Sequence, residues 1–256
     1  MQSIVGIFRS RVNAERAAER LKSLGILERN INLLTPGNEN DLQRVPIVEG
    51  EQPGMGKAVG AVVGGALGAA TASLFLPGVG PVVAIGTVAA ALLGAAVGAA
   101  GGAAAGAAME ESLAQGMPVD EMFIYEDALR RGRSIVITFV EDDKQHEQAT
   151  GILLTEGAES LDAARESWWV GLRDVESEHY HAHGRDFTAD EMKYRRGFEA
   201  ALSLPNRGQS YEENEEHLRR RYPDLWRDEA FRFGYNRGVE YQDRVREQHR
   251  KETILI

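Results

Sequence analysis

The sequence predicts an α+β fold followed by an all-α C-terminal module, and three observations support this prediction. Short β-branched runs alternate with helix-periodic segments near both ends of residues 1–163. A run without any charged side chain, from Ala58 to Met109, separates these two parts. After residue 163 the chain becomes polar, arginine-rich and aromatic, which is typical of a module with its own core.

Residues 1–55 predict a strand, a helix and a second strand. SIVGIFR is short and β-branched, and INLLT is a similar run that precedes the turn pair Pro36-Gly37. We expect Asn13 to cap the helix between them and Gly25 to end it. The apolar residues of this helix recur at helical spacing: Ala14, Ala17, Ala18, Leu21 and Leu24.

Residues 109–163 predict a short helix followed by a second strand-helix-strand unit. PVDEMFIYEDALRRG suits the short helix, RSIVITFV is the clearest strand of the chain, and ESLDA suits a last short strand. Asp142 and Gln145 resemble a capping box, and Gly157 is placed to end the helix that they begin. The order of elements in 1–55 and 109–163 is that of a ferredoxin-like β-α-β-β-α-β sandwich with an insertion before its third strand.

The insertion, residues 56–108, predicts a glycine-zipper helical hairpin. Glycine costs about 1 kcal/mol relative to alanine in a helix, so glycines on a four-residue period need a compensating contact. Such a stripe lets another backbone approach closely, and we expect helices near 57–76 and 82–114 to face each other through it. The stripe contains Gly56, Gly60, Gly64 and Gly68 in the first helix and Gly86, Gly94, Gly98, Gly102 and Gly106 in the second, with Ala90 filling the gap. A tight turn is expected at Pro77, Gly78, Gly80 and Pro81.

The outer surface of this hairpin leaves two interpretations open. The first helix is long enough to span a bilayer, which predicts a membrane-inserted protein on the cytoplasmic side of the inner membrane with lipid as a partner. Alternatively, copies of the hairpin pack together in a soluble cytoplasmic homo-oligomer. Self-association is expected in both cases, because one apolar face of each helix would otherwise stay uncovered.

Charge, cysteine content and the first residues restrict the function classes. A net charge of −10 argues against nucleic-acid binding. The absence of cysteine excludes disulfides and thiolate chemistry. MQSIVGIFRSR has no basic segment followed by an apolar stretch, so we expect no secretory signal.

Residues 164–256 predict a separate helical module with a weak internal repeat. DEMKYRRGFEAAL and DEAFRFGYNRGVEY each place two aromatic residues four apart around a glycine. Such a triplet allows close approach of another helix, so we expect helix contacts at Tyr194, Gly197, Phe198, Phe231, Gly234 and Tyr235. Helical patterns fall near 163–182, 188–204, 209–221 and 225–250.

Three further clusters in this module are candidate sites. His179, His181 and His183 could offer metal ligands, but we favour a solvated or packing cluster and predict no metal. Trp168 and Trp169 suit packing between domains better than a membrane interface. The three consecutive arginines of HLRRRYPDLWR follow four glutamates, which favours helix ion pairs over phosphate binding. No nucleophile–base pair stands out, so we predict a protein that is not an enzyme and has no cofactor; a ligand-binding module is the remaining alternative.

Residues 1–162 resemble a bacterial family, the heat-induced or general stress protein domains. The resemblance rests on SIVGIFRSRVNAERAAERLKSLGILERNINLL, on the glycine-rich hairpin with PGVGP at its tip, and on GMPVDEMFIYEDALRRGRSIVITFV. The tail is similar to tails that accompany such domains. The resemblance implies a stress-associated, non-enzymatic structural protein and supplies no catalytic residues.

Overall fold

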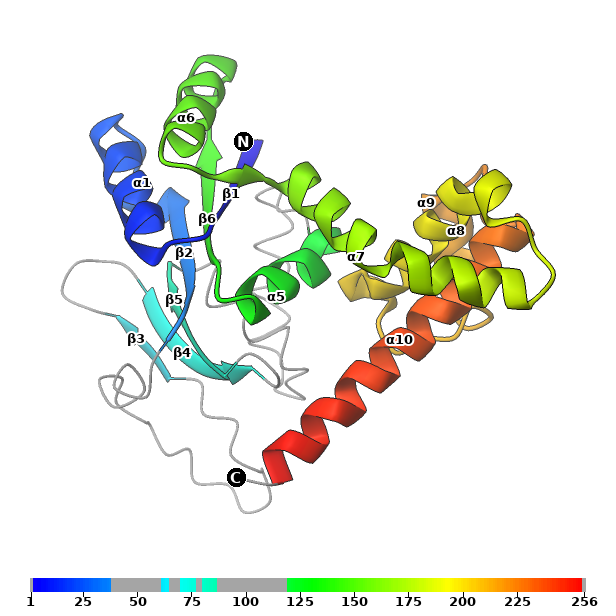
Figure 1. Ribbon diagram of the computed structural model, residues 1–256. Coiled ribbons are helices and arrows are strands. Elements are labelled where there is room, and N and C mark those ends of the chain that lie inside the picture. Colours follow the sequence, from blue (N-terminus) through cyan, green and yellow to red (C-terminus); the bar gives the residue numbers. More distant parts are fainter. Residues whose placement is uncertain (1, 38–60, 65–69, 77–79, 87–118, 255–256) are drawn as a thin grey trace. The chain divides into compact units, whose positions relative to one another are not determined.

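The computed structural model describes residues 2–37, 61–64, 70–76, 80–86 and 119–254, and it has an α+β fold (Figure 1). The chain divides into two compact units. Unit 1 comprises Met1–Pro118 and Ile124–Arg165, and unit 2 comprises Val119–Phe123 and Glu166–Ile256. We describe each unit by itself.

A single antiparallel sheet forms the centre of unit 1. Among the described residues its strands follow the order β3-β4-β5-β2-β6-β1-β7. Its central strands are paired antiparallel over several residues. Val5 of β1 lies opposite Ile137 of β6, and Leu33 of β2 lies opposite Val136 of β6. The strands are β1 (Gln2–Phe8), β2 (Ile31–Pro36), β3 (Ala61–Gly64), β4 (Ala70–Leu76), β5 (Gly80–Ile85), β6 (Ser134–Val140) and β7 (Glu159–Ser160).

Two helices, α1 (Arg11–Ser23) and α6 (Asp143–Thr155), pack side by side on one face of this sheet (Figure 1). The predicted apolar stripe of α1 is confirmed, since its alanines and Leu21 are buried and Leu24 packs against them. Burial of such side chains contributes about 25 cal/mol per Å² of apolar surface, which holds the helices on the sheet. The shared cluster contains Ile4, Phe8, Ala14, Ala17, Ala18, Leu21, Leu33, Val136, Val140, Ala149 and Leu153.

Helix ends in unit 1 follow the sequence signals with one exception. The side chain of Asp142 accepts a hydrogen bond from the Gln145 backbone N–H at 2.8 Å, as predicted for the start of α6. Gly25 and Gly157 follow α1 and α6 with φ of 96° and 87°, left-handed values that favour glycine. The prediction that Asn13 caps α1 is wrong, because α1 begins at Arg11 after an extended Ser10. The short helix before β6 is α5 (Met122–Arg130).

The predicted helical hairpin is wrong wherever the structure describes its residues. Residues 61–64, 70–76 and 80–85 form strands that continue the sheet outward from β2. The β-branched pairs Val62-Val63 and Val82-Val83 suit a pleated sheet, and pairing with β2 satisfies backbone groups without the cost of helical glycines. Val82 and Ala84 of β5 have no exposed surface, so this continuation is part of the core.

The glycines predicted for helix packing therefore have other roles or lie outside the described residues. Gly64 pairs with Ala70 between β3 and β4. Gly86 follows β5 with φ 107°, and a Cβ there would lie 2.3 Å from Asn32 Oδ1, so a side chain would clash. Outside the described residues lie Gly56, Gly60, Gly68, Pro77, Gly78, Gly94, Gly98, Gly102 and Gly106.

The chain reverses where the turn was predicted, but between strands rather than between helices. Leu76 of β4 lies opposite Gly80 of β5, and residues 77–79 between them are not described. Gly80 and Pro81 belong to β5 itself. Within the described part of the chain, no helix has the length and apolar character needed to cross a bilayer.

Unit 2 is helical. Its main helices are α7 (Leu161–Ala182), which enters this unit at Glu166, α8 (Phe187–Leu202), α9 (Glu215–Arg221) and α10 (Glu229–Ile254), and each overlaps one of the four predicted segments. The helix α9 begins later than predicted, because Ser210 and Glu213 form a turn in which the Glu213 carboxylate accepts from the Ser210 N–H at 2.9 Å.

The backbones of α8 and α10 touch at their glycines. A Cβ on Gly197 would lie 1.9 Å from the Phe231 carbonyl oxygen, and a Cβ on Gly234 would lie 2.0 Å from that of Tyr194. The two contacts are reciprocal, because each glycine meets the residue three positions before the other glycine. Small residues permit this approach, and a larger side chain would separate the helices.

We expect Gly197→Ala to destabilise unit 2 by about 3 kcal/mol, because the new methyl would overlap backbone that cannot move aside. Gly171→Ala is the matched control: no atom lies within 4 Å of its added Cβ, so it should stabilise α7 by up to about 1 kcal/mol. Urea unfolding followed by tryptophan fluorescence measures both, since all three tryptophans belong to unit 2. Equal midpoints for Gly197→Ala and the wild type would contradict the contact.

Candidate functional site

The two tryptophans singled out from the sequence lie in the core of unit 2. Trp168 and Trp169 are 4% and 1% exposed. Trp168 packs on Phe123 with ring centroids 4.8 Å apart, and the Trp169 Nε1–H donates to the Glu191 carboxylate at 3.0 Å. Their role in the structure is packing and orientation inside this unit.

A buried charge network joins α7, α8 and α10. Arg237 donates twice to the Glu176 carboxylate, at 2.8 and 3.1 Å, and the Tyr194 hydroxyl donates to Glu176 at 2.7 Å. Glu176 and Arg237 are 1% and 7% exposed. Burial, with the Glu176 contact, raises the pKa of Tyr194, so this phenol stays protonated and donates. Arg237 Nη1 also donates to Glu240 at 3.1 Å, and the network links the three helices and stabilises their arrangement.

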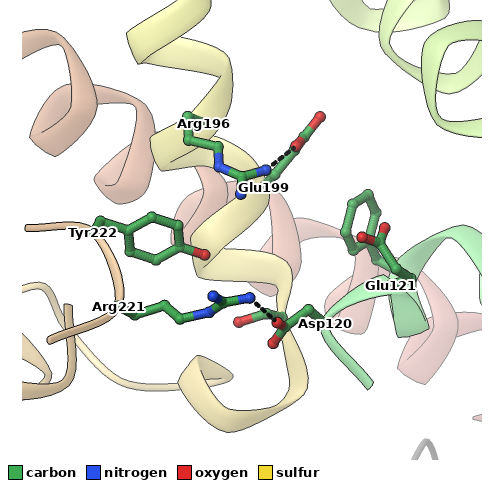
Figure 2. A pocket seen from close by; sticks show the side chains of 8 residues that line it. Asp120, Glu121, Arg196, Glu199, Arg221 and Tyr222 are labelled. Carbon is green, nitrogen blue, oxygen red and sulfur yellow. Dashed lines mark hydrogen bonds and ion pairs between the residues drawn. The ribbon is translucent and has the colours of Figure 1, made fainter. Parts of the chain in front are cut away.

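A hollow in unit 2 lies beside α8 (Figure 2). It is open to solvent, has a volume of about 40 Å³, and combines side chains of α8 and α9 with those of the Val119–Phe123 segment. Its lining residues are Asp120, Glu121, Phe123, Arg196, Glu199, Ser203, Arg221 and Tyr222.

The charges of this hollow are largely matched to one another. Arg221 Nη2 donates to Asp120 at 3.0 Å, and Arg196 Nη1 lies 3.8 Å from the Glu199 carboxylate (Figure 2). Outside the hollow, Glu199 also accepts from Arg195 at 2.7 Å. The Tyr222 ring lies between two guanidinium groups, those of Arg196 and Arg221, at 5.5 and 6.0 Å. Burial raises the pKa of Tyr222, so its hydroxyl is a proton donor at neutral pH and not a base. A hollow of this size has room for about three water molecules, and the side chains that line it supply no activated nucleophile.

The arginine-rich segment forms ion pairs with other elements instead of within its own helix. Arg221 reaches Asp120, and the upstream Glu212 pairs with Arg232 of α10. The expectation of ion pairs was therefore correct, but the expectation that they form along one helix was wrong. Arg219 and Arg220 lie in the last turn of α9, and their side chains are exposed.

The histidine cluster lies at the C-terminal end of α7. The rings of His179 and His183 lie 4.6 Å apart, while His181 contacts Ser177 instead. Over the described ranges, no three side chains of the metal-ligating types gather into a ready-made cage.

The helix-contact residues predicted from the internal repeat are brought together. Gly197 meets Phe231 and Gly234 meets Tyr194, as described above, and Tyr194 and Phe198 pack against Trp169. Tyr235 contacts Tyr211 at 5.5 Å. Sequence reasoning missed Glu176 and Arg237, since charged residues at helical spacing are usually solvated. It also missed Asp120, which is distant from α9 in sequence.

We compared the chain with family models, with curated proteins and with solved structures, and none of the three comparisons found a match.

We expect Glu191 to make unit 2 sensitive to acid. Hydrogen bonds from Arg173 hold the pKa of Glu191 below its ordinary 4.5. A carboxyl with a depressed folded-state pKa stabilises the fold above about pH 4.5, and that contribution is lost as the pH falls through the lower value. Glu191→Gln should therefore cost about 1 kcal/mol at pH 7 and less toward pH 3.

Urea unfolding between pH 7 and pH 3 measures this difference. Glu178→Gln, which changes an exposed carboxylate on α7, is the control and should leave stability nearly unchanged. A penalty for Glu191→Gln that stays constant over this pH range would contradict the assignment.

Proposed function

We propose that the protein is a non-enzymatic structural protein that assembles with copies of itself through the charge-free segment of unit 1. The observation that carries this proposal is the position of strand β3. Of the strands that the structure describes, only β4 pairs with β3, so β3 ends the sheet.

The composition of this edge supports pairing with another chain. Natural sheets protect their edges with charged residues, and lysine is common there. The strands β3, β4 and β5 all belong to the run from Ala58 to Met109, which contains no charged side chain. A second copy can add a strand to such an edge through main-chain hydrogen bonds, as in β-augmentation.

The opposite edge of the same sheet is protected in the expected way. There β7 has two residues, Glu159 and Ser160, and Glu159 is paired with Arg133 at 2.5 Å. A short, charged edge resists pairing with another chain. The contrast between the two edges supports assembly at β3.

The ferredoxin-like topology of the sheet domain is also part of this proposal. We propose that β2-β6-β1-β7, with α1 and α6 on one face, is a ferredoxin-like sandwich that β5, β4 and β3 widen. The resemblance to heat-induced or general stress proteins adds a role in the stress response of a bacterial cell.

Lysine substitution at the edge tests the assembly. Adjacent residues of a strand face opposite sides of the sheet, so Val62→Lys and Val63→Lys are examined separately. We expect the wild type to form an oligomer and at least one variant to weaken self-association about tenfold or more, because a buried charge is costly. Light scattering after size-exclusion chromatography measures the mass, in buffer and in mild detergent.

Val170→Lys is the matched control, since Val170 is 61% exposed on α7 and its replacement should leave the mass unchanged. Circular dichroism checks that each variant is folded. A monomeric wild type, or unchanged mass in both β3 variants, would refute assembly at this edge. Recovery of the protein only in carbonate-washed membranes would favour the lipid-inserted interpretation instead.

A further inference from the structure

One pair of side chains outside the proposed assembly surface has the chemistry of a metal site. His179 lies in the last turn of α7, and His183, four residues later, lies in the turn that directly follows the helix. The centroids of their rings are 4.6 Å apart. Two histidines at this spacing can chelate a divalent transition metal when both rings face the same side, as in the HExxH motif.

The tautomer of His183 is fixed by its surroundings. Its Nδ1 lies 2.8 Å from the carbonyl oxygen of His179. A carbonyl oxygen can only accept, so Nδ1 carries the hydrogen and Nε2 keeps its lone pair. Histidines that bind metals commonly donate their second ring N–H to a backbone carbonyl in this way.

The two rings are also held in place before any ion binds. The Phe233 ring lies 5.8 Å from His179 and 5.1 Å from His183, so it packs against both. Because packing restricts the rings, less conformational entropy is lost on binding. His183 is exposed to solvent, whereas His179 is half-buried and its Nδ1 is enclosed.

The charged side chains that act on His179 are Arg237, Glu176 and Glu240. The guanidinium of Arg185 lies 5.1 Å from the Phe233 ring centroid and adds a positive charge near the pair. The two carboxylates offset part of this repulsion toward a cation.

We propose that His179 and His183 together bind one divalent transition-metal ion, such as Zn²⁺, Ni²⁺ or Cu²⁺, with water completing its coordination. Imidazole nitrogen suits these ions, and the chain has no cysteine to compete for them. With two protein ligands the site takes up and releases its ion readily. It is independent of the assembly at β3, since it lies in unit 2.

Calorimetric titration of the full-length protein with zinc chloride at pH 7.5 tests the site. We expect saturable binding of one ion by the wild type, and a loss of affinity of about tenfold or more in His183→Gln. His181→Gln is the matched control, because His181 is exposed between the two ligands and contacts Ser177. Its affinity should stay within about twofold of the wild type.

A second measurement distinguishes a loss of metal binding from misfolding of the variant. Zinc should raise the melting temperature of the wild type and of His181→Gln, but not that of a folded His183→Gln. Binding should also weaken below pH 6, because imidazoles must lose their protons to bind. Absence of saturable binding, binding that His183→Gln leaves unchanged, or an equal loss in His181→Gln would overturn the proposal.

Discussion

Direct backbone contact between α8 and α10 is the constraint on which the rest of unit 2 depends. Gly197 and Gly234 face the carbonyl oxygens of Phe231 and Tyr194, at positions where even a methyl group would overlap. Close approach brings the aromatic residues beside these glycines into the core, where Tyr194, Phe198, Phe231 and Tyr235 are fully buried. The cost of helical glycine, about 1 kcal/mol per residue, is offset by this packing.

The buried Glu176–Arg237 pair is a consequence of the same crossing. Two desolvated charges are costly, and such a pair is tolerated only with good geometry and with its remaining donors satisfied. Bidentate contact and the Tyr194 hydroxyl meet this requirement. Because the three residues come from three helices, the network is satisfied in one arrangement of α7, α8 and α10, which makes it specific as well as stable.

Unit 1 is organised by a different requirement, the pairing of extended backbone. Its sheet buries Val136 and Val140 against α1 and α6, and it extends from β2 into the uncharged strands β5, β4 and β3. This extension ends at a strand without charge. The sheet domain and the helical unit thus present different surfaces: one offers main-chain hydrogen bonds, and the other offers a hollow and a pair of imidazoles.

The sequence by itself determined the local elements with strong signals. Periodicity predicted α1 and its buried stripe. Asp142 and Gly157 marked the two ends of α6. The repeat of aromatic residues around a glycine identified the residues at which α8 and α10 meet. Tertiary structure decided what local signals leave ambiguous. A glycine- and valine-rich run suits a close-packed helix or a strand, and here pairing with β2 selected the strand. Glu176 and Asp120 find their partners in segments that are distant in sequence. The hydrogen bond between His183 and the His179 carbonyl depends on the orientation of a side chain. Periodicity encodes neither of these.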